Sequence, residues 1–126
     1  MTNKETFLVA AYGTLRKGWG NSRLVDTPQN KHVGTGKTVE KYTMRASGIP
    51  FLSKEPMVNI TVDLWEITKE SLVNVDALEG HPEWYKRELV PVEVDGTVYD
   101  AYIYFNEGSK ADIVESGDFN NRRKVY

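Results

Sequence analysis

Two short segments of this chain carry the residue types from which a small-molecule active site could be built. The first is the junction Tyr12-Gly13-Thr14-Leu15, which follows the apolar run Phe7–Ala11. A glycine just past a buried strand permits a sharp turn and a close approach of a ligand to the main chain. Successive backbone N–H groups in such a turn can hold an anion, and a carboxylate fits as well as a phosphate does. Taken alone, the pattern is more typical of a purely structural strand end.

The second segment contains Glu79, which we expect at the last turn of a helix. A carboxylate there meets the negative end of the helix dipole, and burial beside Trp84 and Tyr85 would act in the same direction. Both effects predict a raised pKa, which is what a general base near neutral pH requires. Taken alone, a glutamate at a helix end is most often a solvated surface residue.

The helix that would position Glu79 has clear signals at both ends. Thr68 can cap it, and Leu72, Val75 and Leu78 recur at helical spacing. Gly80 is a typical C-terminal stop. The sequence therefore predicts a helix from Thr68 through Leu78.

The remaining segments favour strands. The run 7–11 is nearly all apolar, which predicts a strand buried on both faces. Residues 57–67 alternate apolar and polar side chains, which predicts a strand with one buried face and with Asp63 on the other. Residues 30–47 predict one or two strands with a bend, residues 14–21 predict a loop, and the stretch from Gly108 onward is polar and irregular.

A hairpin is predicted around the two-residue turn Asp95-Gly96. Folding the chain there gives one apolar face, which is consistent with burial. The expected opposite pairs are Val94 with Thr97, Val92 with Tyr99, and Val90 with Ala101. The order of strands, helix and hairpin predicts an α+β fold on a mixed, barrel-like sheet, in one domain over residues 1–126.

Composition and charge exclude several classes of protein. The 126 residues carry a formal net charge of −2 and no cysteine, so disulfides, zinc–thiolate sites and thiol nucleophiles are absent. No apolar stretch approaches the roughly 20 residues of a membrane span, and residues 1–5 lack the apolar core of a signal peptide. The basic run Arg122-Arg123-Lys124 is short and predicts a solvated cluster rather than a nucleic-acid site. We therefore expect a cytoplasmic protein that binds neither nucleic acid nor membrane.

Two other candidate sites can be set aside. Gly36-Lys37-Thr38 ends like a phosphate-binding P-loop, but Lys31 stands where that motif needs a glycine. His32 and His81 are the only histidines and lack metal-ligand spacing, so no metal site is predicted.

Four features, taken in order along the chain, form a wider pattern. They are Tyr12 to Gly18 after a buried strand; Leu78-Glu79-Gly80 followed by Pro82, Tyr85 and Arg87; the strand ending Ala101-Tyr102-Ile103-Tyr104; and Ser116-Gly117-Asp118. Together they resemble the γ-glutamyl cyclotransferase-like family, and more closely its γ-glutamylamine cyclotransferase and AIG2-like branch. One departure is Phe119, at a position where relatives often carry tryptophan.

The resemblance implies a compact mixed barrel with flanking helices and a cofactor-independent intramolecular reaction. The α-amino group of a small γ-glutamyl substrate attacks its own side-chain carbonyl and releases 5-oxoproline and an amine. Glu79 matches the family's acid/base carboxylate. Tyr12, Gly13, Thr14 and Leu15 match the loop that holds the substrate, and Tyr85 joins them as a substrate-binding residue. The γ-glutamyl compound and the oligomeric state stay open.

Two other functions remain compatible with these residues. One is a binding module on the same fold that holds a γ-glutamyl or other carboxylate ligand without turnover. The other is a protein-interaction domain with a vestigial pocket. Glu79 favours catalysis, because a pure carboxylate binder gains nothing from a second negative charge beside its ligand.

Overall fold

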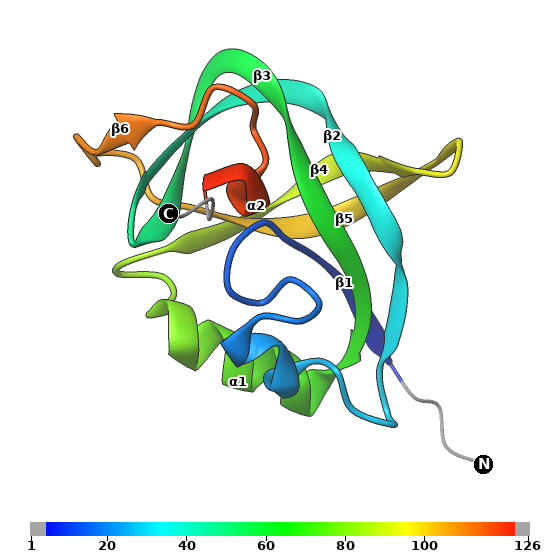
Figure 1. Ribbon diagram of the computed structural model, residues 1–126. Helices are drawn as coiled ribbons and strands as arrows, with labels where there is room; N and C mark the ends of the chain where they lie inside the picture. Colours follow the sequence, from blue (N-terminus) through cyan, green and yellow to red (C-terminus); the bar gives the residue numbers. More distant parts are fainter. Residues whose placement is uncertain (1–4, 123–126) are drawn as a thin grey trace.

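The computed structural model describes residues 5–122 and shows a strongly curved sheet with helices against it (Figure 1). Residues 123 and 124 of the basic run lie outside the described part. Within residues 5–122, no helix is long and apolar enough to cross a membrane. The elements in chain order are β1 (Thr6–Ala11), η1 (Gly20–Leu24, a 3₁₀ helix), β2 (Lys31–Ser47), β3 (Ile49–Thr68), α1 (Lys69–Glu79), β4 (Lys86–Val94), β5 (Thr97–Phe105), β6 (Asp112–Ile113) and α2 (Phe119–Arg122).

The strands close into a ring. Their order is β3-β1-β5-β4-β2-β6, and a further pairing of β2 with β3 joins the two sides. β1 and β5 run parallel, whereas the other pairs are antiparallel, so the sheet is mixed. The short β6 extends the ring beyond β2. The predicted α+β fold, a mixed barrel-like sheet with flanking helices, is confirmed.

The hairpin and the helix were predicted closely. The β4–β5 register pairs Val94 with Thr97, as the turn signal implied. Thr68 accepts a hydrogen bond from the Ser71 amide at 3.2 Å and caps α1. Gly80 ends the helix at φ 67°, a left-handed conformation that glycine adopts without strain.

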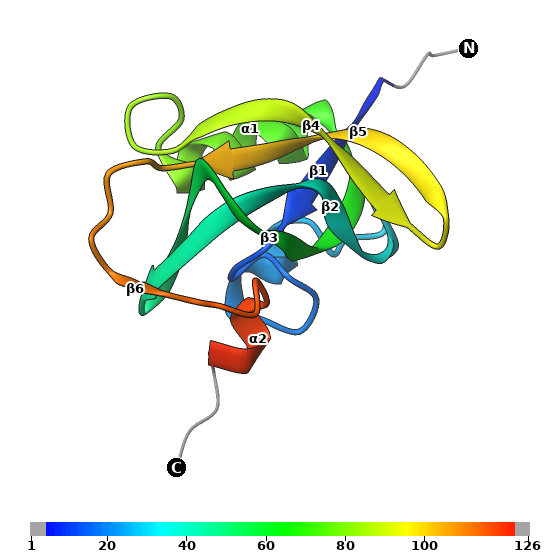
Figure 2. The same ribbon diagram turned by 90° about the horizontal axis from the view of Figure 1, so that it is seen from above.

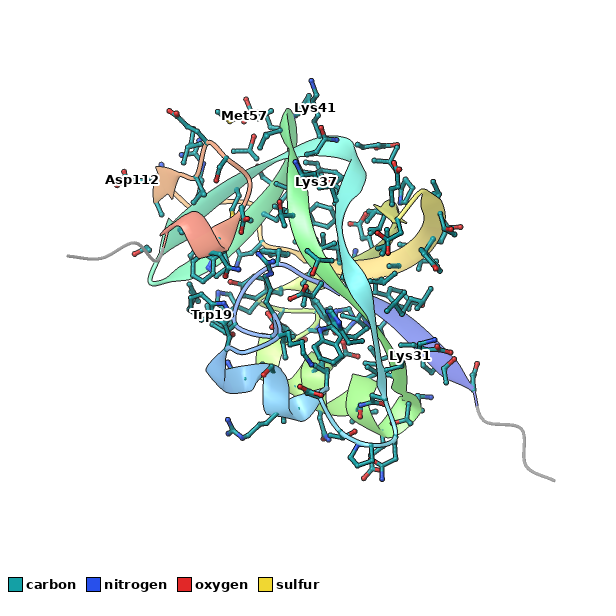
Figure 3. The ribbon with its side chains drawn as sticks, turned by 45° about the vertical axis from the view of Figure 1, so that its right-hand side comes forward. Trp19, Lys31, Lys37, Lys41, Met57 and Asp112 are labelled. Atoms are coloured by element: carbon teal, nitrogen blue, oxygen red, sulfur yellow. The ribbon has the colours of Figure 1, made fainter. Side chains whose placement is uncertain are left out.

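The strand β3 is longer than predicted, because it begins at Ile49, before the expected residue 57. Residues 31–47 form one strand with three register shifts, which is one of the two outcomes predicted for residues 30–47. Lys31 and Lys41, labelled in Figure 3, show how far β2 runs across the molecule. Beyond Lys41, which pairs with Asn59 of β3, the strand β2 continues to Ser47. Register shifts let so long a ribbon bend around the ring.

Burial divides the molecule into two cores. One fills the ring, and the other lies between the outer face of β1 and the helix α1, which Figure 2 shows alongside the strands. β1 contributes to both cores, because Ala10 points inward and Val9 and Ala11 point outward. The prediction of a strand buried on both faces is therefore confirmed.

Two expectations about polar segments were wrong. Asp63 is only 3% exposed, because the loop after β1 covers that face of β3. The stretch from Gly108 onward contains β6 and α2, and its side chains Val114 and Phe119 are buried. Tertiary packing of two scattered apolar residues ordered a segment that carries no periodic pattern.

Candidate active site

All six residues predicted for the site line one cavity. Its volume is about 150 Å³, below the roughly 300–1,000 Å³ of pockets for drug-sized ligands. It therefore suits a group the size of one amino acid. The walls come from β1 with the loop that follows it, from the end of α1 with the loop before β4, and from the β2–β3 turn. The lining residues are Val9, Ala10, Ala11, Tyr12, Gly13, Thr14, Leu15, Asn21, Ile49, Pro50, Leu78, Glu79, Trp84, Tyr85 and Tyr104.

The loop after β1 contributes to the lining of this cavity residues whose backbone amides are unpaired within the described part of the chain. The Arg16 amide donates to the Gly13 carbonyl at 3.0 Å and closes a tight turn. Among residues 5–122, the amides of Gly13, Thr14 and Leu15 have no acceptor. Three successive free N–H groups are the donor set that a carboxylate needs.

Asn21 is a cavity residue that the sequence did not point to. Its Nδ2 donates to the Thr14 Oγ1 at 2.8 Å. Because that hydroxyl oxygen accepts from Asn21, its own proton is free to donate to a ligand. Asn21 thus orients a fourth donor beside the three amides.

Gly13 is required for a different reason from the one expected. Its backbone does not adopt a positive φ. A Cβ at this position would lie 2.6 Å from the Pro50 Cγ, a distance that real contacts do not show. Close packing of the loop against the β2–β3 turn, rather than a left-handed turn, selects glycine here.

Glu79 is half-buried at the end of α1, and its pKa is raised to about 7. Burial is the main cause, and the negative charge of Asp76 is the second. The predicted direction and the role of burial hold, whereas Asp76 was not anticipated. Among the described residues, the Glu79 carboxylate has no hydrogen-bond or ion-pair partner. It is therefore free to exchange a proton with a bound molecule.

Asp76 stays ionised because two side chains hold it. Arg87 donates to both carboxylate oxygens, at 2.8 and 3.0 Å, and Tyr104 donates its hydroxyl at 2.5 Å. Burial alone would raise the pKa of Asp76, but these hydrogen bonds offset it and lower the pKa below its usual value. The Arg87 guanidinium also lies 4.5 Å above the Tyr102 ring centroid, so the pair is fixed in place.

The two predicted tyrosines donate their hydroxyl protons within the protein. Tyr12 donates to the Tyr104 carbonyl at 2.6 Å, and Tyr85 donates to the Pro50 carbonyl at 2.8 Å. Burial raises the pKa of both, and the charge of Glu79 adds to it. Both hydroxyls are therefore protonated near neutral pH, and these side chains offer a ligand their ring faces and hydroxyl oxygens.

Asp63 anchors the loop that carries the amides of Gly13, Thr14 and Leu15, called the donor loop below. Its carboxylate accepts from the Arg16 Nε at 3.2 Å, from the Lys17 amide at 2.8 Å and from the Thr35 hydroxyl at 2.6 Å. Burial would raise the pKa of Asp63, but these bonds lower it overall. An ionised, almost fully buried aspartate fixes where the chain turns after residue 15. The alternating pattern gave no sign of it, since it placed Asp63 on the exposed face.

Residues 118–120 contact the donor loop as well. Arg16 also donates to Asp118 at 2.7 Å, and the Trp19 Nε1 donates to the Asn120 Oδ1 at 2.8 Å. The Trp19 ring lies 5.0 Å from that of Phe119, centroid to centroid. Figure 1 shows α2 next to the loop after β1, and Figure 3 labels Trp19 below it. Phe119 therefore packs well at the position where tryptophan was expected.

Metal ligands do not gather here. Across residues 5–122, no three His, Cys, Asp or Glu side chains cluster as a metal site.

Comparison with known proteins identifies the family. The model of the family described as "Gamma-glutamyl cyclotransferase, AIG2-like" matches residues 9–121. The chain belongs to this family. Its members are γ-glutamyl cyclotransferases, which catalyse an intramolecular cyclisation, so the prediction of an enzyme of this type is confirmed.

Individual relatives agree with this assignment. A protein of Methanocaldococcus jannaschii, provisionally named a gamma-glutamylcyclotransferase, is 38% identical over 117 residues, which cover 91% of this chain and 97% of that protein. The Gamma-glutamylaminecyclotransferase B of Danio rerio is 33% identical over 110 residues, covering 77% of this chain and 58% of its own length.

Solved structures share the fold. The crystal structure of an AIG2-like protein from Mus musculus superposes with a TM-score of 0.79 at 24% identity, covering 90% of this chain and 89% of that chain. At this level of identity the likeness concerns the fold alone.

Proposed function

We propose that this cyclotransferase releases 5-oxoproline from a γ-glutamyl amine or a small γ-glutamyl conjugate, with Glu79 as general acid and base. The observation that carries the proposal is that one small cavity holds both parts of the required machinery. It contains an unpaired carboxylate whose pKa is about 7, and three free backbone amides that suit a carboxylate. A γ-glutamyl group has an α-carboxylate and an α-ammonium on one carbon, so it can use both.

The amides of Gly13, Thr14 and Leu15, with the Thr14 hydroxyl, bind the α-carboxylate in this proposal. Glu79 in its ionised form takes a proton from the α-ammonium. The freed amine attacks the γ-carbonyl carbon, so that a C–N bond forms and closes the five-membered ring. The tetrahedral intermediate then collapses, and the original amide C–N bond breaks as the leaving nitrogen takes the proton from Glu79. Glu79 next takes the second proton of the ring nitrogen, and that proton departs with the released amine as an ammonium ion, which returns Glu79 to its ionised form.

This route asks little of the protein. The nucleophile belongs to the substrate, so no serine or cysteine is needed. Because the amine and the carbonyl belong to one molecule, the attack is already unimolecular, and the cavity needs only to hold the two groups in the reactive conformation. Glu79 supplies proton transfer, which contributes roughly 10²–10⁴-fold. A pKa near 7 lets the same group accept a proton and give it back at neutral pH.

The test is Glu79→Gln, with 5-oxoproline measured by mass spectrometry across a panel of γ-glutamyl compounds. We expect turnover to fall by about 10²–10⁴-fold, because the amide cannot take the proton. Glu83→Gln is the matched control, since Glu83 is exposed on the adjacent loop and does not line the cavity. Thermal melting of both variants checks the fold.

Full turnover by the Gln variant would refute the role of Glu79. A wild-type protein that is thermally stabilised by γ-glutamyl ligands but forms no product from any of them would instead be the non-catalytic binder.

A further inference from the structure

Two large apolar side chains stand exposed beside the catalytic cavity. Trp84 is 53% exposed and Leu78 is 38% exposed, and both line the cavity wall. Large apolar surface next to a site of defined chemistry marks a place where a ligand contacts the protein. The donor loop and Glu79 account for the γ-glutamyl part of a substrate, and these two side chains have no role in that part.

Trp84 is held in position before any ligand arrives. Its amide donates to the Gly80 carbonyl at 2.8 Å, which closes the loop after α1. Its ring stands edge-on to the Tyr85 ring at 5.0 Å between centroids. A Cβ on Gly80 would lie 3.1 Å from the Trp84 Cβ, so the loop packs tightly at this point. An indole fixed in this way loses little freedom when it binds a ligand.

Another part of the cavity lining is also apolar. Ile49 and Pro50 reach the cavity from the first residues of β3. Glu79 is the one charged side chain among the residues that line the cavity, so this part of the wall has no cation to pair with a carboxylate. These four side chains, Leu78 and Trp84 near the end of α1 and Ile49 and Pro50 at the start of β3, are called the apolar mouth below.

We propose that the apolar mouth binds the carbon substituent of the leaving amine, and that the enzyme therefore prefers γ-glutamyl conjugates whose amine carries an uncharged alkyl or aryl group. This inference rests on the proposed function. Because Glu79 protonates the leaving nitrogen, the substituent on that nitrogen must lie beside Glu79. Leu78 precedes Glu79 on α1, and Trp84 lies on the loop that follows, so the substituent meets apolar surface as it leaves the cavity.

A series of γ-glutamyl n-alkylamides, from methyl to hexyl, tests the inference. Burial of one methylene corresponds to about 0.8 kcal/mol, or roughly four-fold in kcat/KM. We expect kcat/KM of the wild type to rise by about two- to four-fold per carbon until the mouth is filled. An amide of similar length that ends in a carboxylate should be processed more slowly than the hexylamide.

The variants Trp84→Ala and Leu78→Ala should each flatten this slope, because they remove apolar surface from the mouth. Leu89→Ala is the matched control for Leu78→Ala, since Leu89 is 59% exposed on β4 and lies outside the cavity wall. It should keep the wild-type slope. The slope compares substrates within one protein preparation, so a loss of folded enzyme does not change it.

A wild type that forms 5-oxoproline from every amide with a flat slope would overturn this inference and leave the proposed function standing. The inference is overturned in the same way if both alanine variants keep the full slope. If no γ-glutamyl amide yields 5-oxoproline, the proposed function fails, and the inference fails with it.

Discussion

Replacing Asp76 by Asn should lower the pKa of Glu79 and move the acid limb of the activity profile. Asp76 precedes Glu79 by three residues on α1, so their Cβ atoms are about 5–6 Å apart. Two unit charges at about 6 Å interact by about 0.7–2.8 kcal/mol for an effective dielectric constant between about 80 and 20. That range corresponds to roughly 0.5–2 pKa units. Loss of the partner carboxylate also leaves the Arg87 charge uncompensated, which acts in the same direction.

The direction of the shift follows from the proposed role of Glu79 as a base. In that role Glu79 has to be ionised in the free enzyme, so kcat/KM should fall as the pH drops through its pKa of about 7. In Asp76→Asn the fall should begin about one pH unit lower. The variant should therefore keep a larger share of its maximal kcat/KM at mildly acidic pH than the wild type does.

The measurement is the rate of 5-oxoproline formation between about pH 5 and pH 8, the range in which a group of this pKa titrates. Asp100→Asn is the matched control, because Asp100 is exposed on β5 and does not line the cavity. An acid limb that stays in place in Asp76→Asn, or that moves upward, would refute the electrostatic coupling. A control that shifts as far as the variant would show that the effect is not local.

Two further predictions concern the anchoring of the donor loop. Gly13→Ala should destabilise the protein by about 1–3 kcal/mol and raise KM, because the new methyl group collides with Pro50. The control Gly20→Ala should change neither quantity, because position 20 has open space around it. Equal urea midpoints for the two variants would show that the collision with Pro50 does not destabilise the protein. Asp63→Asn should cost about 1.5–3 kcal/mol at neutral pH, because Arg16 and the Lys17 amide lose a charged acceptor while Asp118 still pairs with Arg16. The pKa of Asp63 is lowered by folding, so this stability is present above about pH 4 and is lost as the pH falls through the folded pKa. Urea unfolding of wild type and variant should therefore converge in acid, and a gap that persists there would show that charge is not its source.

Local signals in the sequence were enough for the helix α1 and for the β4–β5 hairpin. Thr68 and Gly80 set the ends of α1 through contacts within a few residues, and Asp95-Gly96 set the hairpin register. In each case the contacts that end the helix or set the turn are made by residues close to the motif in the sequence. The two cavity segments were found because a glycine turn and a helix-end glutamate are also local patterns.

Contacts between distant segments could not be predicted in this way. Asp63 lies 47 positions from Arg16, and Asp118 lies 102 positions away, yet all three form one ion-pair group. Arg87 and Tyr104 reach Asp76 from two different strands. Which of these residues meet depends on how the strands close into a ring, and a short stretch of sequence does not contain that information. The direction of the Glu79 pKa shift was therefore predicted, whereas the contribution of Asp76 was not.

The attachment of α2 to the loop after β1 bears on when the protein becomes active during its synthesis. Tyr12 to Leu15 leave the ribosome early, but their support from Asp118 and from the Trp19–Phe119 contact needs residues made about one hundred positions later. The parallel pairing of β1 with β5 is likewise available only after the hairpin has emerged. A nascent chain that ends before residue 118 thus carries Glu79 without a fully supported donor loop. Substrate turnover should begin only after Asp118 and Phe119 have been synthesised, so translation products that end before these residues would be catalytically silent.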